Sequence, residues 1–319
     1  MHKNFVNKIF FIFLVACCFS SLFATDWPIK INESKETSIK YNFAEDRYGL
    51  FSTGFVFSTG EEDVTSFADG KMIFTCDANS SYYTQFSSTL GSFAIVAHPD
   101  KMVSVYANLS EINQEAKQKI DVVVGEKLGK IIPDDKLREL KKKLETENED
   151  ENEIIVPQNF GFHTKKETFE FQVLDTKNNV SINSYLILPK YDKLLGIYPG
   201  SIYLENKKGT VYNLDEKKVL PSGSYSVYRD FVPGKMPLST SILINGKSAV
   251  TINYDTVIYK NGILVSSGKE NFPFEKIFAL PKKQFLGEVQ FVRGKNEITT
   301  IVTDFNNNSR KITYIVDMY

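Results

Sequence analysis

The sequence predicts a mostly β protein, and three observations support this prediction. Short runs rich in Val, Ile, Phe and Tyr recur along most of the chain, and such side chains favour strands because they fit a pleated, half-buried surface. Turn-forming pairs separate the runs, with Asn245-Gly246 and Asn261-Gly262 as the strongest hairpin signals. Helical periodicity is confined to Pro133–Glu153. A chain of 319 residues also predicts about two domains, each able to bury a core.

The first 24 residues are typical of an export signal. Lys3 and Lys8 precede Ile9–Phe23, an almost wholly apolar run. This run is too short for a membrane span of roughly 20 residues, and its length matches the apolar region of a signal peptide. Ala24 places a small residue at the end of the run. We therefore predict cleavage after Ala24 and an exported protein that is periplasmic or envelope-associated.

Cys17 supports an alternative in which the protein carries a lipid anchor. Leu14-Val15-Ala16-Cys17 resembles a bacterial lipobox, with Cys17 as the lipid-bearing residue. The apolar run continues for six residues beyond Cys17, whereas lipoproteins usually turn polar at once. Soluble export is therefore favoured, and both alternatives place the mature chain outside the cytoplasm.

The remaining composition excludes several classes of protein. Removal of residues 1–24 takes away two lysines and no acid, which changes the formal charge from −1 to −3. A balance this close to neutral gives no indication of nucleic-acid binding. Cys76 is then the one cysteine that remains, so neither an internal disulfide nor a cysteine-based metal site is expected. Downstream of the signal, no run is long and apolar enough to form a transmembrane segment.

The first half of the mature chain is predicted to form a sheet. Phe93–Ala97 and Met102–Tyr106 flank the polar residues 98–101. Two strand-like runs across a short turn that contains Pro and Asp predict a hairpin. Further strands are expected at Thr168–Val173 and Ser184–Leu188.

Residues 130–158 form an insertion of a different character. Leu137, Leu140 and Leu144 fall at i, i+3 and i+7 with Lys and Arg between them, which predicts a short amphipathic helix. Six of the nine residues in 145–153 are acidic. A solvated acidic segment is the simplest interpretation, and a charge-based docking tail is the alternative.

From residue 190 onward the pattern changes to short strands separated by turns. Strands at roughly 8–12-residue spacing, in a segment of about 130 residues, predict an immunoglobulin-like β-sandwich over residues 190–319. The expected strands are Ile202–Glu205, Gly209–Asn213, Ser224–Arg229, Ser241–Ile244, Val250–Tyr254, Thr256–Tyr259, Thr299–Val302 and Lys311–Val316.

One part of the first half carries a more specific pattern. A glycine, an apolar strand, a His-Pro-Asp turn, a Tyr-Ala-Asn-Leu-Ser segment and a valine-to-glycine stretch follow one another in Gly91–Asp100, Tyr106–Ser110 and Val124–Gly129. Weaker matches lie on both sides in the expected order, at Phe67–Ile73, Phe169–Val173 and Asn183–Pro189. The arrangement resembles the core of LytM/lysostaphin-type peptidoglycan zinc endopeptidases. The resemblance implies a LytM-like β-sheet domain over residues 41–189, interrupted by the helical and acidic insertion.

The resemblance also implies which residues should carry the chemistry. In this family two histidines and an aspartate hold a zinc ion, and another histidine transfers a proton. The first ligand pair falls on Ser52 and Val56, the histidine of the Tyr-x-His segment on Asn108, and the closing His-x-His pair on Thr168 and Glu170. Valine cannot ligate zinc, asparagine cannot move a proton near neutral pH, and a lone carboxylate is no zinc site. The family's scaffold is therefore expected without its catalytic residues, its metal or any other cofactor.

Histidine is scarce in this chain, which supports the same expectation. Of the three histidines, His2 lies in the predicted signal. His98 falls in the predicted hairpin turn, where a surface or turn-stabilising role is expected. His163 lies seven residues before Glu170, and a metal-binding role for it is the less favoured interpretation. Two histidines are fewer than the family's zinc site and proton transfer require.

The sequence thus predicts a non-catalytic envelope protein, a pseudoenzyme with a metallopeptidase-like fold. Its vestigial groove, near Asn108, Thr168, Glu170, His98 and His163, is expected to bind peptidoglycan or a cell-wall hydrolase. Two alternatives stay open. One is an active zinc-dependent peptidoglycan endopeptidase with atypical ligands, and the other is a structural envelope lipoprotein anchored through Cys17.

Overall fold

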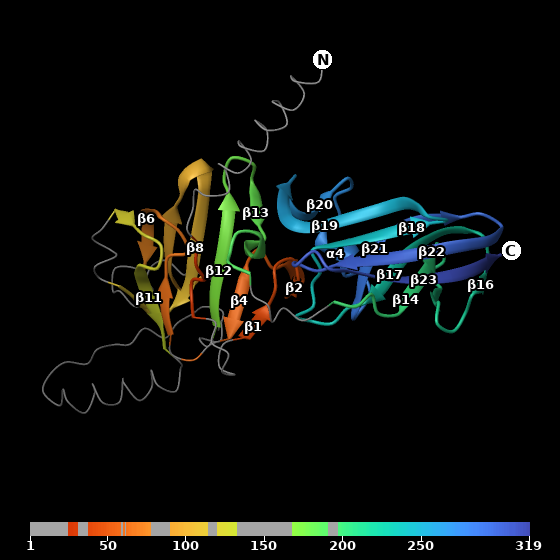
Figure 1. Cartoon of the computed structure of the whole chain (residues 1–319), viewed down its shortest axis with the longest axis horizontal. Helices are drawn as coiled ribbons and strands as arrows, with labels where there is room; N and C mark the ends of the chain where they lie inside the picture. Colours follow the sequence, from red (N-terminus) through yellow and green to blue (C-terminus); the bar gives the residue numbers. More distant parts are fainter. Residues whose placement is uncertain are drawn as a thin grey trace, which may run out of the picture.

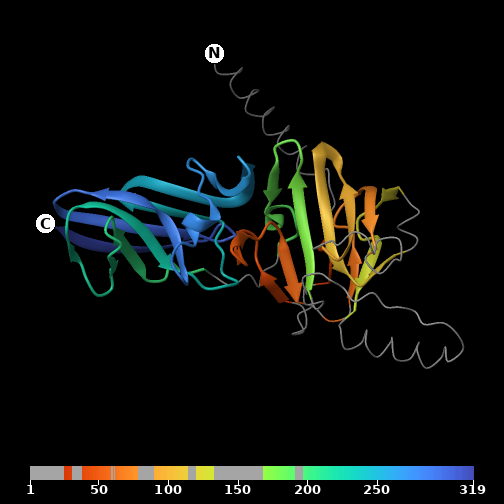
Figure 2. The same ribbon diagram turned by 180° about the vertical axis from the view of Figure 1, so that it is seen from behind.

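The computed structural model describes residues 25–30, 38–58, 60, 62–77, 90–113, 120–132, 168–190 and 197–319. Within these ranges the protein is mostly β, which confirms the predicted fold class. The strands form two parts that lie end to end along the long axis of the molecule (Figures 1 and 2). No helix among the described residues is long and apolar enough to cross a membrane. The helix predicted within Pro133–Glu153 lies outside the described residues.

The elements of the first part are short and almost all strands. They are β1 (Ser38–Tyr41), β2 (Asp46–Arg47), β3 (Leu50–Phe51), β4 (Phe55–Ser58), β5 (Glu62–Thr65), β6 (Gly70–Cys76), β7 (Ser92–Ala97), the 3-10 helix η2 (Pro99–Lys101), β8 (Met102–Leu109), β9 (Glu111–Ile112), β10 (Asp121–Val122), β11 (Lys127–Ile131), β12 (Thr168–Asp175), β13 (Val180–Ile182) and the 3-10 helix η3 (Ser184–Leu186).

The second part has longer strands. They are β14 (Ile202–Asn206), β15 (Val211–Asn213), β16 (Val219–Leu220), β17 (Gly223–Asp230), β18 (Ser239–Ile244), β19 (Lys247–Lys260), β20 (Ile263–Gly268), the one-turn helix α4 (Phe274–Ile277), β21 (Lys283–Phe291), β22 (Gly294–Thr303) and β23 (Ser309–Met318).

Strand β12 is the centre of the first part. Along one edge it pairs with β4 and then with β13, and along the other edge it pairs with β8, always antiparallel. Beyond β8 the sheet continues through β7 and β6 to β10, and β1 pairs with β4. Side chains on β12 are therefore held in the middle of a wide sheet.

One face of this sheet forms the core. Phe55 and Phe57 of β4 lie opposite Phe171 and Phe169 of β12, and all four side chains are fully buried. Tyr106 on β8 joins them, with its ring centroid 5.3 Å from that of Phe171. The small sheet β5-β11-β9 adds side chains to the same buried cluster: Val64, Leu128 and Ile131. Since a slip of one residue would turn every Phe to the other face, this core fixes the register of β4 and β12.

The hairpins predicted from sequence are confirmed. Strands β7 and β8 pair antiparallel with Ala97 opposite Val103, and residues 98–101 form the connection. The pairs Asn245-Gly246 and Asn261-Gly262 connect β18 to β19 and β19 to β20, with φ of 50° and 74° at the first pair and 52° and 86° at the second. A two-residue hairpin turn of type I′ requires positive φ at both positions, which Asn and Gly adopt at low cost.

The second part consists of two sheets packed face to face. One has the order β15-β14-β17-β21, and the other runs β19-β18-β22-β23-β16 with β20 attached to β19. Strand β21 packs across β18 and β19. The buried cluster draws on both sheets: Val227, Leu286, Ile252 and Tyr254.

The two parts share one ladder of strands. Strand β13 pairs antiparallel with β19, Ser181 opposite Val257, so the main sheet of the first part continues into the second (Figure 1). Asn183 fixes this seam, because its backbone N–H donates to the carbonyl oxygen of Asp255 (2.8 Å) and its side-chain Nδ2 donates to that of Tyr254 (2.9 Å). The parts are therefore oriented by backbone pairing as well as by packing.

A buried carboxylate also lies at the seam. Glu45 accepts hydrogen bonds from the backbone N–H groups of Asn42 (2.9 Å) and Gly234 (2.7 Å), which belong to the first and second parts. Burial raises the pKa of the Glu45 carboxyl, and these hydrogen bonds partly oppose the rise.

Three features of the fold differ from the sequence predictions. The pattern predicts a strand over Ser184–Leu188, but the chain forms η3 there because Asn183 Oδ1 accepts a hydrogen bond from the N–H of Tyr185 (3.2 Å) and caps the turn. The two strands predicted at Val250–Tyr254 and Thr256–Tyr259 are one strand, β19, with Asp255 at the irregularity where its pairing with β20 shifts register. Strand β21 was missed by the pattern altogether.

Candidate functional site

Positions singled out by the family resemblance form one row across the main sheet. Val56 of β4 lies opposite Glu170 of β12, and Glu170 lies opposite Ala107 of β8. The row extends to Tyr41 on β1 and Phe93 on β7. Paired residues of neighbouring strands point to the same face, so these side chains share the face opposite the Phe core. Val56, Ala107 and Glu170 are each buried.

Glu170 is the charged centre of this row. Its side chain is 6% exposed, and its Oε1 accepts from Arg47 Nη1 at 2.6 Å and from Gln172 Nε2 at 2.6 Å. An isolated carboxylate at this depth would cost several kcal/mol of desolvation. The charge-assisted hydrogen bond from the guanidinium offsets that cost. Glu170 is therefore neutralised by a side chain of the same protein.

Arg47 reaches Glu170 from the short hairpin β2–β3. Asp46 pairs with Phe51 and Arg47 with Leu50, and the turn residues Tyr48 and Gly49 have φ of 58° and 84°. The turn is closed by Asp46 Oδ1, which accepts from the N–H of Gly49 (3.0 Å). The hairpin leaves 22% of the Arg47 side chain exposed. Sequence reasoning missed Arg47, because nothing in a lone Asp-Arg-Tyr-Gly stretch indicates a partner for a distant glutamate.

The residues at the family's ligand positions do not fit a zinc site. Val56 offers no donor atom, and Ser52 Oγ is engaged locally, donating to the carbonyl oxygen of Gly54 (2.8 Å). Catalytic zinc takes three protein ligands, whereas Glu170 supplies one carboxylate that is already ion-paired. Among the described residues, no group of three or more His, Cys, Asp or Glu side chains is placed to hold a metal ion. Thr168 lies two residues before Glu170 on the same strand and is buried.

Asn108 lies beside the row, at a β-bulge. Phe93 pairs with Ala107 and Ser92 with Leu109, so Asn108 is the extra residue, and its φ is 62°. Asparagine tolerates this left-handed conformation better than most residues. Gly91, with φ 62°, lies against it, since a Cβ at Gly91 would be 3.0 Å from Asn108 Oδ1. The structure thus brings Asn108, Val56, Thr168 and Glu170 to one region of the sheet.

His98 lies at the opposite end of β8 from Asn108 and is part of a separate network. Its Nδ1 is 2.7 Å from the carbonyl oxygen of Asp69, which fixes Nδ1–H as the donor and leaves Nε2 as the acceptor for Ser104 Oγ at 2.7 Å. Ser104 Oγ in turn lies 3.2 Å from the hydroxyl oxygen of Tyr106. Ser104 and Tyr106 are fully buried, so this network connects the hairpin turn to the core rather than to a ligand surface. His163 and Cys17 lie outside the described residues.

We predict that His98 makes stability fall at acidic pH. Burial lowers the pKa of His98 in the folded protein, although the hydrogen bond to Asp69 partly opposes this. The unfolded chain therefore takes up the proton more readily, and the free energy of unfolding should decline as pH falls below about 6.5. His98→Gln should remove this part of the pH dependence and, through lost hydrogen bonds, cost about 1–2 kcal/mol at pH 8. Urea unfolding at pH 8 and pH 5 measures both effects. His163→Gln is the matched variant, and an unchanged pH slope in His98→Gln would contradict the prediction.

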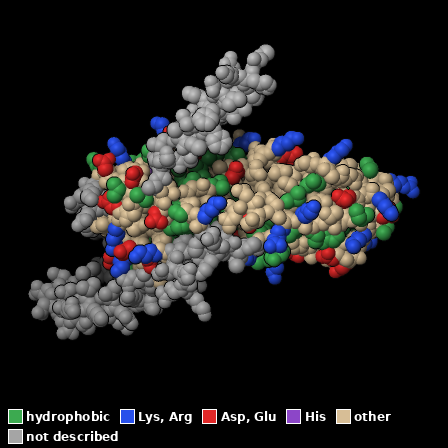
Figure 3. Space-filling model, in the orientation of Figure 1, with side chains coloured by type: hydrophobic (Ala, Val, Ile, Leu, Met, Phe, Trp, Pro, Cys, Tyr) green, Lys and Arg blue, Asp and Glu red, His purple; other side chains and the backbone are tan. Residues whose placement is uncertain are grey.

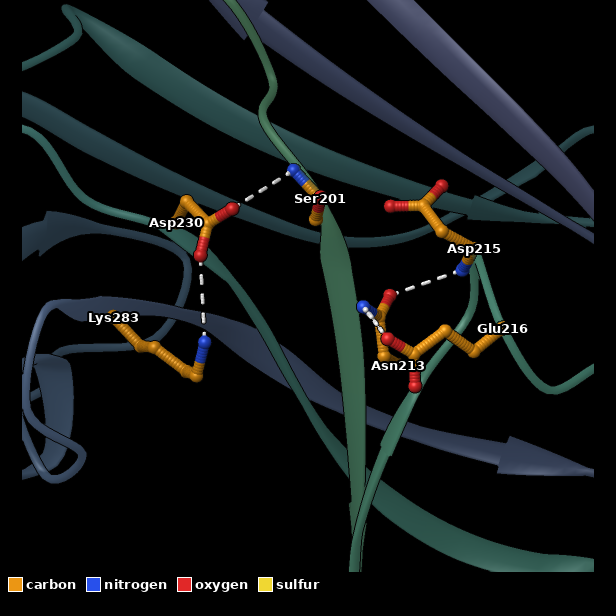
Figure 4. A network of polar contacts seen from close by, with 6 residues as sticks. All are labelled: Ser201, Asn213, Asp215, Glu216, Asp230 and Lys283. Carbon is orange, nitrogen blue, oxygen red and sulfur yellow. Dashed lines mark hydrogen bonds and ion pairs between the residues drawn. The ribbon is translucent and has the colours of Figure 1, made fainter.

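The second part contains another polar cluster, drawn in Figure 4. Asp230 accepts from the N–H of Ser201 (3.3 Å) and from Lys283 Nζ (3.3 Å), and Asn213 Oδ1 accepts from the N–H of Asp215 (3.0 Å). Tyr314 Oη donates to Asp215 Oδ1 (2.6 Å), and this hydrogen bond lowers the pKa of the Asp215 carboxyl. Asp230 links the residue before β14 and Lys283 of β21 to β17, and Asp215 links the turn after β15 to β23. The cluster therefore stabilises the end of the two-sheet part.

The chain was compared with protein-family models, with curated proteins and with solved structures. A protein-family model matches residues 197–319, the range of the second part. No curated protein matches the chain. The similar solved structures include the complex of SpoIIIAH and SpoIIQ, at 16% identity and a TM-score of 0.33 over 51% of this chain and 99% of the other. Csd3 of Helicobacter pylori matches at 16% identity and a TM-score of 0.34 over 55% of this chain, which spans 36% of the Csd3 chain. Lysostaphin matches at 14% identity and a TM-score of 0.32 over 91% of this chain and 96% of its own.

Proposed function

We propose that this protein is an exported, non-catalytic protein of the cell envelope that binds peptidoglycan or a cell-wall hydrolase. The Arg47–Glu170 ion pair is the observation that carries the proposal. To take a zinc ion, Glu170 would have to release the Arg47 guanidinium, and Val56 beside it could not share the metal. Without a metal-bound water the family's hydrolysis of the peptide bond has no nucleophile.

The domain organisation is part of this proposal. Residues 41–189 are a degenerate LytM-like domain with an insertion at 130–158, and residues 190–319 are an immunoglobulin-like sandwich that acts as a spacer or partner-binding module. The match of a family model to residues 197–319 supports treating that range as a unit. The two facing sheets support the sandwich. The β13–β19 seam would hold the first domain in a fixed orientation on the second.

The binding surface is proposed at the Asn108 end of β8. Glu170 and Thr168 are buried and His98 lies at the far end of the strand, whereas Asn108 is part-exposed at a bulge that interrupts the ladder. A bulge redirects a side chain out of the pairing row, and bulges are common beside functional sites. Acidic and basic side chains are intermixed over the described part of the face in Figure 3, which fits a polar ligand surface better than a nucleic-acid surface.

Sedimentation with purified peptidoglycan tests the proposal. The exported chain, from Thr25 onward, should co-sediment with peptidoglycan, or should co-purify with a purified cell-wall hydrolase, and should release no fragments when zinc is supplied. Zinc-dependent release of fragments would contradict the proposal and favour an endopeptidase with atypical ligands. Mass spectrometry of the mature N-terminus separates soluble export, which begins at Thr25, from the lipoprotein alternative, which begins at an acylated Cys17.

We predict that Asn108→Lys weakens binding at least about tenfold, a loss of about 1.4 kcal/mol, because a long cation would project from the bulge into the ligand. The measurement is a binding isotherm together with a thermal melt. Asn179→Lys is the matched control, since Asn179 also has a left-handed backbone (φ 54°) and is exposed in the turn between β12 and β13. Equal affinity of the two variants would remove Asn108 from the binding surface.

A further inference from the structure

We infer that Arg47 is the anchor for the terminal carboxylate of a peptide ligand. The inference rests on the proposed function and deepens it, because it names the chemical group that this end of the first domain recognises. Arg47 holds its place through Glu170, the residue that corresponds to a ligand of the family's metal. The protein would thus present an organic cation where the related enzymes present a metal ion.

The guanidinium of Arg47 has donors to spare. Among the residues that the structure describes, Glu170 is the one acceptor in contact with Arg47, through Nη1. A guanidinium carries several N–H donors in a planar fork, which matches the two oxygens of a carboxylate. The Arg47 side chain is 22% exposed and that of Glu170 is 6% exposed. Part of the Arg47 side chain thus reaches solvent, whereas the carboxylate of Glu170 lies beneath the surface.

The fork is held in place before a ligand arrives. Glu170 sits in the middle of β12 and is itself fixed by Gln172 Nε2 at 2.6 Å. The two-residue turn of Tyr48 and Gly49 holds the backbone of Arg47 from the other side. Because Arg47 loses little further rotamer freedom on binding, the entropy cost of recognition is reduced.

The hairpin tip and the neighbouring strand β1 add groups that suit a peptide end. Tyr48 is 85% exposed although its φ of 58° is strained for an aromatic residue. The ring of Tyr41 lies 6.2 Å from that of Tyr48, and Lys40 Nζ lies 5.8 Å from the centroid of the Tyr41 ring. Tyr41 lies opposite Val56 in the row that contains Glu170, so two phenol rings and a second cation adjoin that row.

The charge balance of the site predicts how it recognises a carboxylate. Arg47 and Glu170 cancel each other's charge at the centre of the site. Net charge therefore gives little attraction, and recognition depends on the paired hydrogen bonds of the fork. A lysine at position 47 would keep the charge opposite Glu170 but lose that geometry.

Isothermal titration with a tripeptide, N-acetyl-lysyl-D-alanyl-D-alanine, and with its C-terminal amide tests the inference. The exported chain should bind the free carboxylate at least tenfold more tightly than the amide. Arg47→Lys should remove most of that preference, while the matched variant Arg310→Lys, in the second part, should keep it. In the wild-type protein the NMR signal of the Arg47 side-chain Nε–H should shift with the carboxylate and not with the amide, which gives a second readout if Arg47→Lys fails to fold.

Equal binding of the two peptides, no binding of either, or an unchanged preference in Arg47→Lys would overturn the inference. Co-sedimentation with peptidoglycan separates the two levels of the proposal. If the chain sediments with peptidoglycan but does not distinguish the peptides, the Arg47 site is wrong and the proposed function stands. If it binds neither peptidoglycan, nor a hydrolase, nor either peptide, both are wrong.

Discussion

Arg47→Ala should destabilise the first part of the protein by about 3 kcal/mol, because it leaves the carboxylate of Glu170 without its counter-ion. Removal of one partner of a buried ion pair typically costs about 3–5 kcal/mol. We expect the lower end of that range, since the Arg47 side chain is 22% exposed and solvent can reach part of the gap. Urea unfolding of the chain from Thr25 onward measures the change.

A matched double variant separates the ion pair from simple truncation. In Arg47→Met/Glu170→Met both charges are replaced by apolar side chains of similar length, and such replacements are often neutral or stabilising. The double variant should lie within about 1 kcal/mol of the wild type, and it should be more stable than Arg47→Met alone. A double variant no more stable than Arg47→Met would show that Glu170 is stabilised by other contacts.

Gly54→Ala should cost about 3 kcal/mol, because there is no room for a Cβ between β4 and β12. A Cβ built on Gly54 overlaps the carbonyl oxygen of Phe171 and would lie 2.6 Å from Gln172 Cγ. The backbone of β12 cannot move away from Gly54 without breaking its hydrogen bonds to β4 or β8. The same shift would disturb Gln172, which holds Glu170.

Gly49→Ala is the comparison for Gly54→Ala. Gly49 has φ of 84° and open space where a Cβ would be built, so alanine there meets backbone strain without a steric overlap. We expect a loss of about 1 kcal/mol. Thermal or urea unfolding of both variants should rank Gly54→Ala as clearly the more damaging. Similar losses would mean that β4 and β12 adapt more easily than their spacing indicates.

The parts of the fold that sequence could predict depend on local signals. The turns at Asn245-Gly246 and Asn261-Gly262 force positive φ and thereby define hairpins whatever surrounds them. The β7–β8 hairpin follows from two apolar runs across a short polar turn. Asn183 shows where prediction from local sequence fails. Its side chain hydrogen-bonds both to its own turn and to the distant carbonyl oxygen of Tyr254, and η3 forms there in place of the predicted strand. Such hydrogen bonds leave no periodic pattern in the sequence.

The candidate site was only half predictable, for a similar reason. Val56 and Glu170 in the row, and Asn108 beside it, came from a motif whose spacing survives in the chain. Arg47 came from no motif: its strand is two residues long, and its turn is Tyr-Gly rather than a strong hairpin pair. With 38 lysines and arginines in the chain, only the folded structure identifies which cation meets Glu170.

Zinc stoichiometry of the purified chain from Thr25 onward is the most direct test of the proposal that Arg47 takes the place of a metal ion beside Glu170. The protein would be exposed to zinc, freed of excess metal and measured by elemental mass spectrometry. A zinc content near zero per chain is the predicted result. One tightly held zinc ion per chain would contradict it, and would mean that the chain keeps a metal centre built from other residues.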